Sequence, residues 1–235
     1  TEDITVTTGA GNDTVTFTGD DTTVGGTSGD GGSLAISTGA GADTISVTYG
    51  TLVSQTISQF ATITAGAGAD LITKVGVNGT TVPSTTTYVM AAGDSGTTVA
   101  TMDQITGFDL GVTTGTRKAD TLDFEGTAAV SAFSAHVDSG VIKGHTFATA
   151  GIITFDDIDT FATALVIGSS NLADVVGYLN TNLAADGTVA FAYDSDSNGV
   201  ADGTMVYHQG SNLATVADDM VFLVGVTGGS LVVQG

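Results

Sequence analysis

A turn of the form Gly-x-Gly-x-Asp, followed two positions later by an aliphatic residue, occurs three times near the start of the chain. The copies read TGAGNDTV at 8–15, TGAGADTI at 38–45 and AGAGADLI at 65–72. Glycine permits positive φ and leaves carbonyl oxygens free to act as ligands, and the aspartate adds a carboxylate. One turn has fewer oxygens than the six to eight that calcium takes, so neighbouring turns would complete each shell.

The repeats therefore predict calcium sites shared between turns. The alternative is a set of plain β-turns, in which Gly and Asp are common. The predicted ligands are the carboxylates and backbone oxygens of the three turns: Asp13, Asp43, Asp70, Gly9, Gly11, Gly39, Gly41, Gly66 and Gly68.

A second group of oxygen ligands lies in the segment DSDSNGVAD at 194–202. Gly199 permits the sharp turn that brings oxygens from the start of such a loop onto one cation. Position twelve is Met205 rather than the bidentate Glu of an EF-hand. The spacing predicts an EF-like calcium loop of moderate affinity, and the alternative is an Asx-rich hairpin tip. The side-chain ligands would stand at loop positions one, three, five and nine: Asp194, Asp196, Asn198 and Asp202.

The elements that position the first three turns can be inferred from their flanks. Aliphatic residues nine positions apart stand on either side of each turn: Val6 and Val15, Ile36 and Ile45, Ile63 and Ile72. This pattern predicts strand, turn and strand in each copy, which is the nine-residue rung of a parallel β-roll or β-helix. If each interval between copies is one coil, the Asp turns stack along one edge. The segment VGGTSGDGGS at 24–33 is either a loop or a fourth, degenerate copy.

We therefore predict a mainly β protein. Residues 1–100 would form a parallel β-solenoid or β-roll-like region, and residues 101–235 a β-rich C-terminal region with two short helices. One helix is expected near 156–166, where Thr154 and Asp157 have capping-box spacing. The other is expected near 171–184, where an apolar stripe recurs at helical spacing. The segments TVAFAY, TMVYHQ and DDMVFLV are expected to form a hairpin and a closing strand.

The charge balance limits the partners. The chain has 25 acidic and four basic residues and a formal net charge of −21. Nucleic acid and anionic membrane are excluded, because each phosphate contact needs a cation. All acidic residues except Glu2 and Glu125 are Asp, whose short side chain suits cation binding at turns and favours it over a halophilic surface. The chain has no Cys for a disulfide or thiolate site and no apolar run long enough for membrane insertion.

No catalytic set is evident, and we predict that the protein is not an enzyme. GDSG at 93–96 is similar to the nucleophile loop of trypsin-like proteases, but no histidine precedes it. His136, His145 and His208 lack metal-ligand spacing. Asp138-Ser139 with His145 could form a cryptic hydrolase site, but a surface turn is the better interpretation.

The three turns resemble degenerate copies of the nonapeptide of repeat-in-toxin (RTX) proteins, Gly-Gly-x-Gly-x-Asp-x-aliphatic-x, with Thr8, Thr38 and Ala65 in place of the first Gly. In that family calcium bridges successive turns of a parallel β-roll. DQITGFD at 103–109 and ADTLDF at 119–124 resemble the sequence that commonly follows such repeats. The resemblance implies several calcium ions, type I secretion, and four further ligands: Asp103, Asp109, Asp120 and Asp123.

These features predict a secreted structural protein that folds on calcium and assembles with copies of itself into a bacterial surface layer or extracellular filament. Identical chains are the expected partners, with a cell-surface polysaccharide as a further candidate. The C-terminal MVFLVGVTGGSLVVQG could contain an uncleaved secretion signal or a closing strand pair. The alternative is the calcium-folded binding or secretion module of a larger RTX adhesin or secreted enzyme. This chain, which opens at Thr1 without Met, would then be a mature part or fragment.

Overall fold

The structure is a computed structural model. It describes residues 3–19, 33–49, 59–76, 84–111, 119–124, 129–130, 133, 136–147, 152–210, 218–227 and 233–234. Strands predominate in these ranges, and one helix is present in them. The prediction of a mainly β protein is confirmed.

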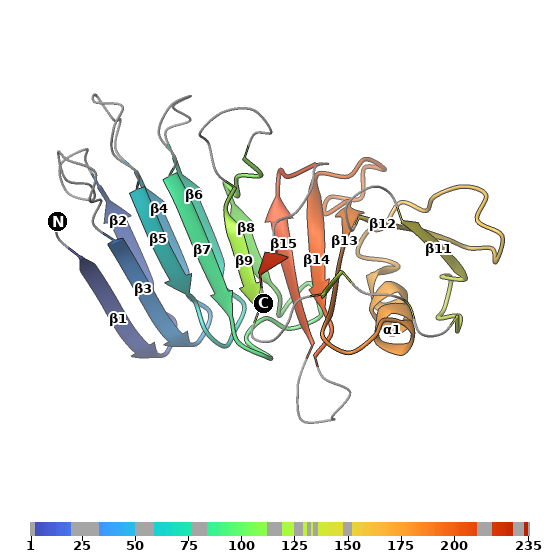
Figure 1. Cartoon of the computed structure of the whole chain (residues 1–235), viewed down its shortest axis with the longest axis horizontal. Helices are drawn as coiled ribbons and strands as arrows, with labels where there is room; N and C mark the ends of the chain where they lie inside the picture. The colour runs from blue at the N-terminus through green and yellow to red at the C-terminus, as the bar shows by residue number, and fades with distance from the viewer. Residues whose placement is uncertain are drawn as a thin grey trace.

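The first nine strands alternate between two sheets (Figure 1). Sheet A consists of β1 (Ile4–Ala10), β3 (Ser33–Ala40), β5 (Gln59–Thr64), β7 (Ser84–Met90), β9 (Thr121–Phe124) and β16 (Val233–Gln234). One half of sheet B consists of β2 (Thr14–Thr18), β4 (Thr44–Thr48), β6 (Leu71–Val75) and β8 (Asp103–Thr106). All neighbours within these sets are parallel. Each pass of the chain therefore adds one strand to each sheet.

The register brings equivalent residues of the repeats side by side. In sheet A, Val6 pairs with Ile36 and Ile36 with Ile63. In sheet B, the aliphatic residues that follow the Asp turns are also paired. Ile45 pairs with Val15 of β2 on one side and with Ile72 of β6 on the other. The nine-residue spacing thus gives one inward aliphatic side chain on each sheet at every level.

The space between the two sheets is filled by these inward side chains. On β4 and β6, for example, buried and more exposed residues alternate with the period of two expected of a strand with one buried face. Burying an aliphatic side chain of this size contributes about 1.5–3 kcal/mol. The fully buried members of this core include Leu34, Ile36, Ile45, Ile63, Ile72, Tyr88, Ile105 and Leu122.

Sheet B continues from β8 into the C-terminal half of the protein, through β15 (Asp219–Val224), β14 (Gly203–His208), β13 (Gly187–Tyr193) and β10 (Ala129–Val130). β13, β14 and β15 are antiparallel neighbours, which confirms the predicted hairpin and closing strand. One face of these strands belongs to the core between the sheets. The other face belongs to a second core that includes α1 (Leu172–Asn182).

The predicted helix near 171–184 is present as α1, but the helix expected near 156–166 is wrong. Thr154 lies in β12 (Ile153–Asp156), which pairs with β11 (Gly144–Phe147) in an antiparallel hairpin. The Asp156 carboxylate accepts backbone N–H groups from Asp157, Ala162 and Thr163. Pairing with β11 and this wrapping of the chain around one carboxylate replace the helical hydrogen bonds.

Both sheets continue across residue 100, since β8 pairs with β6 and β9 pairs with β7. The division into regions 1–100 and 101–235 stays a prediction. Residues 24–32 of the proposed fourth copy, and residues 228–232 and 235 of the C-terminal segment, lie outside the described residues. No helix among the described residues is long and apolar enough to cross a membrane.

The stacked turns make a direct prediction about glycine. Gly66 has φ +86°, and a Cβ at this position would lie 1.9 Å from the carbonyl oxygen of Gly39. Gly66→Ala should therefore reduce the free energy of unfolding by about 1–3 kcal/mol or more, as measured by urea denaturation.

Gly9→Ala is the matched control, because Gly9 holds the same position in the first copy but a Cβ added there would meet nothing within 4 Å. Its effect should stay within about 0.5 kcal/mol. Equal losses in the two variants would contradict the stacked geometry.

Candidate metal-binding sites

The aspartates of the three repeats form one column, which Asp103 extends. The backbone N–H of Asp13 donates to Oδ1 of Asp43 over 2.7 Å. The N–H of Asp43 donates in the same way to Asp70 over 2.7 Å, and that of Asp70 to Asp103 over 2.8 Å. Each inner carboxylate thus ties its own turn to the preceding one. We call these four residues the aspartate column.

One oxygen of each inner carboxylate has no hydrogen-bond partner among the described residues. These atoms are Oδ2 of Asp43, Asp70 and Asp103, in residues that are 1%, 2% and 0% exposed. A buried carboxylate without compensation is costly, so it requires a proton or a cation. Neighbouring strands are about 4.8 Å apart, about twice the calcium–oxygen distance of about 2.4 Å. A calcium ion between two turns could therefore contact an oxygen from each.

The column ends at a buried serine. The N–H of Asp103 donates to Oγ of Ser95 over 2.7 Å, and this hydroxyl donates to the carbonyl of Met220 over 2.6 Å. The carboxylate of Asp219 accepts the N–H of Ser95 at 3.0 Å and that of Gly93 at 3.1 Å. The C-terminal strand β15 thereby closes the stack of turns.

The GDSG loop at 93–96 is therefore a fourth turn of the stack. The N–H of Gly68 donates to the carbonyl of Asp94 over 3.0 Å, and Gly68 forms a parallel bridge with Ser95. Ser95 is fully buried. This environment accounts for the hydroxyl as a structural hydrogen-bonding group.

Burial perturbs the carboxyls at this end of the column. Desolvation raises the pKa of Asp103 to about 8 and the pKa values of Asp70 and Asp219 to about 6. Backbone hydrogen bonds act in the opposite direction, and neighbouring carboxylates add to the increase. Without a bound cation, these groups therefore favour protonation in the folded chain.

The turn glycines permit the close approach of one copy to the next. Gly39 and Gly41 have φ values of +99° and +147°, and a Cβ on either would lie 2.2 Å from the carbonyl oxygen of Gly9 or Gly11, respectively. The same relation holds between the second and third copies, at Gly66 and Gly68. These carbonyl oxygens approach the glycine of the next turn, and their role as calcium ligands stays a prediction.

The second predicted site forms the loop between β13 and β14. Carboxylate oxygens of Asp194, Asp196 and Asp202 lie within 4.8 Å of one another. The N–H of Asn198 donates to both Asp194 and Asp196 at 3.2 Å, and its side-chain amide donates to Asp196 over 2.9 Å. Gly199, at φ +89°, donates its N–H to Asp194 over 2.8 Å. The four predicted ligands are thus brought together in one loop.

Asp194 is the anchor of this loop because it is only 3% exposed. Burial acts to raise its pKa, but hydrogen bonds, first from the N–H of Gly199 and then from that of Asn198, outweigh it and hold the pKa below the usual value. Asp202 is positioned from the other side, by the hydroxyl of Ser195 over 2.7 Å. Asp194 therefore offers an ionised carboxylate to a cation near neutral pH.

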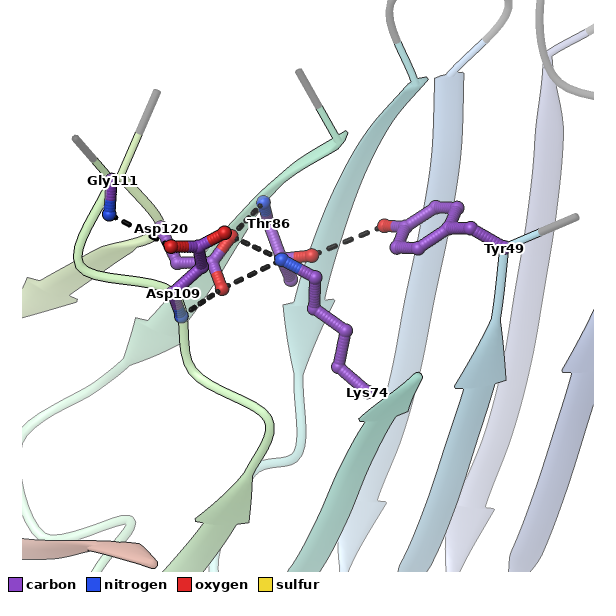
Figure 2. A network of polar contacts seen from close by, with 6 residues as sticks. All are labelled: Tyr49, Lys74, Thr86, Asp109, Gly111 and Asp120. Atoms are coloured by element: carbon purple, nitrogen blue, oxygen red, sulfur yellow. Dashed lines mark hydrogen bonds and ion pairs between the residues drawn. The ribbon is translucent and has the colours of Figure 1, made fainter. Parts of the chain in front are cut away.

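A buried ion pair lies at the opposite ends of the strands (Figure 2). Nζ of Lys74 lies 2.6 and 2.7 Å from the two oxygens of Asp120. The same oxygens accept the N–H of Thr86 at 2.8 Å and that of Asp109 at 2.9 Å. Lys74 is 5% and Asp120 0% exposed. The ammonium group thus supplies the positive charge that a metal would otherwise bring to Asp120.

The remaining two predicted ligands do not join a carboxylate cluster in the described structure. Asp109 contributes its N–H to Asp120 and accepts the N–H of Gly111 over 2.8 Å. Asp123 lies on β9 in register with Val89 of β7. Calcium binding by Asp109, Asp120 and Asp123 stays a prediction, and these residues form no part of the sites proposed below.

A third group of possible ligands has no signal in the sequence spacing. Ligand atoms of His136, Asp138 and Asp159 lie within 4.8 Å of one another, and all three residues are exposed. His136 Nε2 contacts the carbonyl of Lys143 at 2.5 Å, and the Lys143 ammonium lies 3.3 Å from Asp138. Exposed acidic groups are common without an ion. Asp159 lies far from His136 and Asp138 in the sequence, so the three residues do not form a recognisable metal-binding motif.

The residues of the conceivable hydrolase site have other partners. Nδ1 of His145 is 2.7 Å from the hydroxyl of Tyr178, and its ring stacks on Phe133. Burial lowers the pKa of His145, and His136 adds to the effect. Ser139 and Ile142 exchange backbone hydrogen bonds in a tight turn. The absence of enzymatic activity stays a prediction.

No protein-family model, curated protein or solved structure matches this chain. The resemblance to RTX proteins therefore depends on the turn motifs and the segments that follow them.

Two features of these sites were not predicted from the sequence: the buried cation Lys74 and the contact between Asp219 and Ser95. In LITKV, Ile72 points inward. Side chains of a strand alternate between its two faces, so Lys74 must point inward as well, and this alternation could have identified a buried cation. The contact between Asp219 and Ser95 spans 124 residues and has no local signal.

The perturbed carboxyls predict an unusual pH dependence. Well below the unfolded pKa of about 3.9 they are neutral in both folded and unfolded chains. As pH rises, the unfolded chain ionises first, so stability is lost until the pH passes the pKa of about 8 at Asp103. In EDTA, the free energy of unfolding in urea should therefore fall between about pH 4 and about pH 8.

Asp103→Asn keeps an acceptor for the N–H of Asp70 and should flatten the upper part of this slope. Asp157→Asn, at an exposed position, should leave it unchanged. If calcium-free protein were more stable at pH 8 than at pH 5, the buried-carboxyl account would be wrong.

The buried ion pair yields a separate prediction. Lys74→Met should lower the free energy of unfolding by about 3–5 kcal/mol, because it removes the ammonium group that balances the buried charge of Asp120 and leaves that carboxylate with backbone N–H donors. Adding Asp120→Asn should recover part of the loss. Lys143→Met removes the exposed pair with Asp138 and should cost no more than about 1 kcal/mol. Similar losses for the two single variants would argue against a buried pair.

Proposed function

We propose that this protein is a calcium-stabilised structural protein, secreted and assembled from identical chains outside the bacterial cell. The convergence of Asp194, Asp196 and Asp202 within 4.8 Å in one loop carries this proposal. Calcium is a hard cation that prefers oxygen ligands in flexible geometry, and the loop contains the Asp-x-Asp-x-Asn-Gly order that suits it.

The aspartate column supports further calcium ions. Its three buried carboxylate oxygens that lack a hydrogen-bond partner among the described residues belong to successive turns, in a chain whose formal net charge is −21. The chain has only four basic residues, and Lys74 already binds Asp120. Among the described residues, Lys143 pairs with Asp138, so no described lysine other than Lys74 is buried beside a carboxylate, and an external cation would supply positive charge to the column.

We further propose that β1 to β9 form a parallel β-roll of the kind expected from the RTX resemblance. The alternation of strands between two parallel sheets supports this proposal, as does the stacking of Gly and Asp at equivalent positions of successive turns. Secretion before folding would then follow from the need for calcium, which is abundant outside the cell.

Self-assembly is supported by the open end of the two sheets. Among the described strands, β1 and β2 are the last members of sheets A and B, and they lie together at the N-terminal end in Figure 1. Each presents backbone groups on one side that could pair with an added strand. Asp13 is the first-copy equivalent of Asp43 and Asp70. In those later copies the carboxylate accepts the backbone N–H of the preceding turn. Another chain could supply that turn.

Isothermal titration should detect calcium binding with dissociation constants on the order of 10⁻⁴–10⁻³ M. Asp202→Asn, which removes a ligand charge from the 194–202 loop, should lower the stoichiometry by one ion. Light scattering and electron microscopy of the same samples should show ordered polymers in millimolar calcium and dispersed chains in EDTA.

Asp186→Asn is the matched control for this experiment, because Asp186 has φ +59°, which Asn tolerates, and lies outside the loop. Its stoichiometry should equal that of the unmodified chain. If the unmodified chain bound no calcium, the proposed function would be refuted. Calcium binding by a monomer that never polymerises would refute the assembly alone.

A further inference from the structure

The outer face of sheet B across β2, β4, β6 and β8 carries a regular grid of hydroxyl groups. The inward side chains of these strands are apolar, except for the ion-paired Lys74 on β6 and Asp103 of the aspartate column on β8, and outward residues alternate with them. Eight of the eleven outward positions are Thr or Ser, and the other three are Leu71, Val75 and Gln104. The central column is unbroken across four strands: Thr16, Ser46, Thr73 and Thr106.

The C-terminal half of the same sheet is covered by α1 and its neighbours, whereas the outward residues of this half are exposed or partly exposed in the part of the chain that the structure describes. On β2 the outward residues Thr14, Thr16 and Thr18 are all exposed. The apolar members are exposed as well, Leu71 by 45% and Val75 by 52%. In the central column Thr16 is exposed, and Ser46, Thr73 and Thr106 are partly exposed, so the face presents hydroxyl and methyl groups to solvent.

This face carries no charged residue, although the chain has a formal net charge of −21. Because it offers no charge pairing, this surface favours an uncharged partner. A surface of hydroxyl donors and acceptors with interspersed methyl groups matches ordered water, which is uncharged and can accept and donate at every oxygen.

The spacing of the grid is regular in two directions. Hydroxyls in one column repeat at the strand separation of about 4.8 Å, and those along one strand repeat every second residue, at about 6.6 Å. The register between these strands advances one residue at a time without a bulge. Threonine is stiff about χ1, so the hydroxyls are held in place before any ligand arrives. The strand separation is close to the shorter repeat of the water oxygens on a prism face of hexagonal ice, and the repeat along the strand is somewhat shorter than the longer one.

We propose that this face binds crystalline water, so that the protein adsorbs to ice and restrains its growth. The unbroken hydroxyl column forms the centre of the contact, and the methyl groups of Thr, with Leu71 and Val75, order the water between hydroxyls. This function is separate from calcium binding, because none of the proposed metal ligands lies on the face.

The outer face of sheet A is less suited to the same contact. It presents Phe60, which is 42% exposed, and Ala35 interrupts the hydroxyls between Thr5 and Thr62. Asp123 adds a charge at the far strand. Threonine is also favoured in strands for packing reasons alone. Comparing variants on the two faces therefore distinguishes two explanations of the threonines on sheet B: binding to ice, or the general preference of threonine for strands.

The test is thermal hysteresis, measured by nanolitre osmometry on the whole chain in calcium-containing buffer. The unmodified protein should hold ice crystals without growth below the melting point and should shape them. Thr73→Lys places a flexible charge in the central column and should reduce the hysteresis severalfold. Ser46→Thr restores a uniform column and should increase it.

Thr62→Lys, on the outer face of sheet A, is the matched control and should keep the hysteresis of the unmodified chain. Circular dichroism and urea unfolding establish that each variant is folded. Absence of hysteresis in the unmodified protein would overturn the proposal, as would an equal loss in Thr62→Lys. If light scattering showed a dimer that Thr73→Lys alone dissociates, the occupant of the face would be a second copy of the chain and the proposal would likewise fail.

Discussion

Buried negative charge is the constraint on which the rest of this structure depends. The turns that connect the two sheets stack their aspartates in one column, in which Asp43, Asp70 and Asp103 are almost completely removed from solvent. Each carboxylate holds the N–H of the neighbouring turn with one oxygen, and the other oxygen has no partner among the described residues. The hydrogen bonds that fix the spacing of the turns therefore also create a need for positive charge.

The molecule meets this need differently at the two ends of its strands. At one end Lys74 contacts both oxygens of Asp120, and two backbone N–H groups complete the shell, so the pair is satisfied from within the chain. At the other end, the donors to the column within the described ranges are backbone N–H groups, and burial raises the pKa of Asp103 to about 8. A proton can neutralise this group, and the calcium ions that we propose would do so by bridging successive turns. The loop at 194–202 adds a separate carboxylate cluster, fixed by the turn at Gly199.

Much of the architecture could be predicted because it depends on short periods in the sequence. Aliphatic residues nine apart correctly placed the paired strands around each turn, and the apolar stripe at Leu172 and Leu179 correctly placed α1. The helix near 156–166 was wrong because pairing with β11 and the hydrogen bonds to Asp156 outweighed a local capping pattern. The contacts of Ser95 with Asp219 could not be predicted, since they join residues far apart in the chain. Lys74 was predictable in principle, because it occupies an inward position of an alternating strand.

Calcium would thus act on the fold and on its assembly through the same residues. With the column neutralised, the parallel sheets can remain stacked up to their open edge at β1 and β2, where another chain could add. The most direct test is the thermal unfolding midpoint of the purified chain at pH 8 in EDTA, in millimolar magnesium and in millimolar calcium. We expect calcium to raise the midpoint well above its value in EDTA, and magnesium to raise it less, since magnesium demands stricter geometry and loses its water reluctantly. A midpoint that is the same in all three solutions would contradict the account.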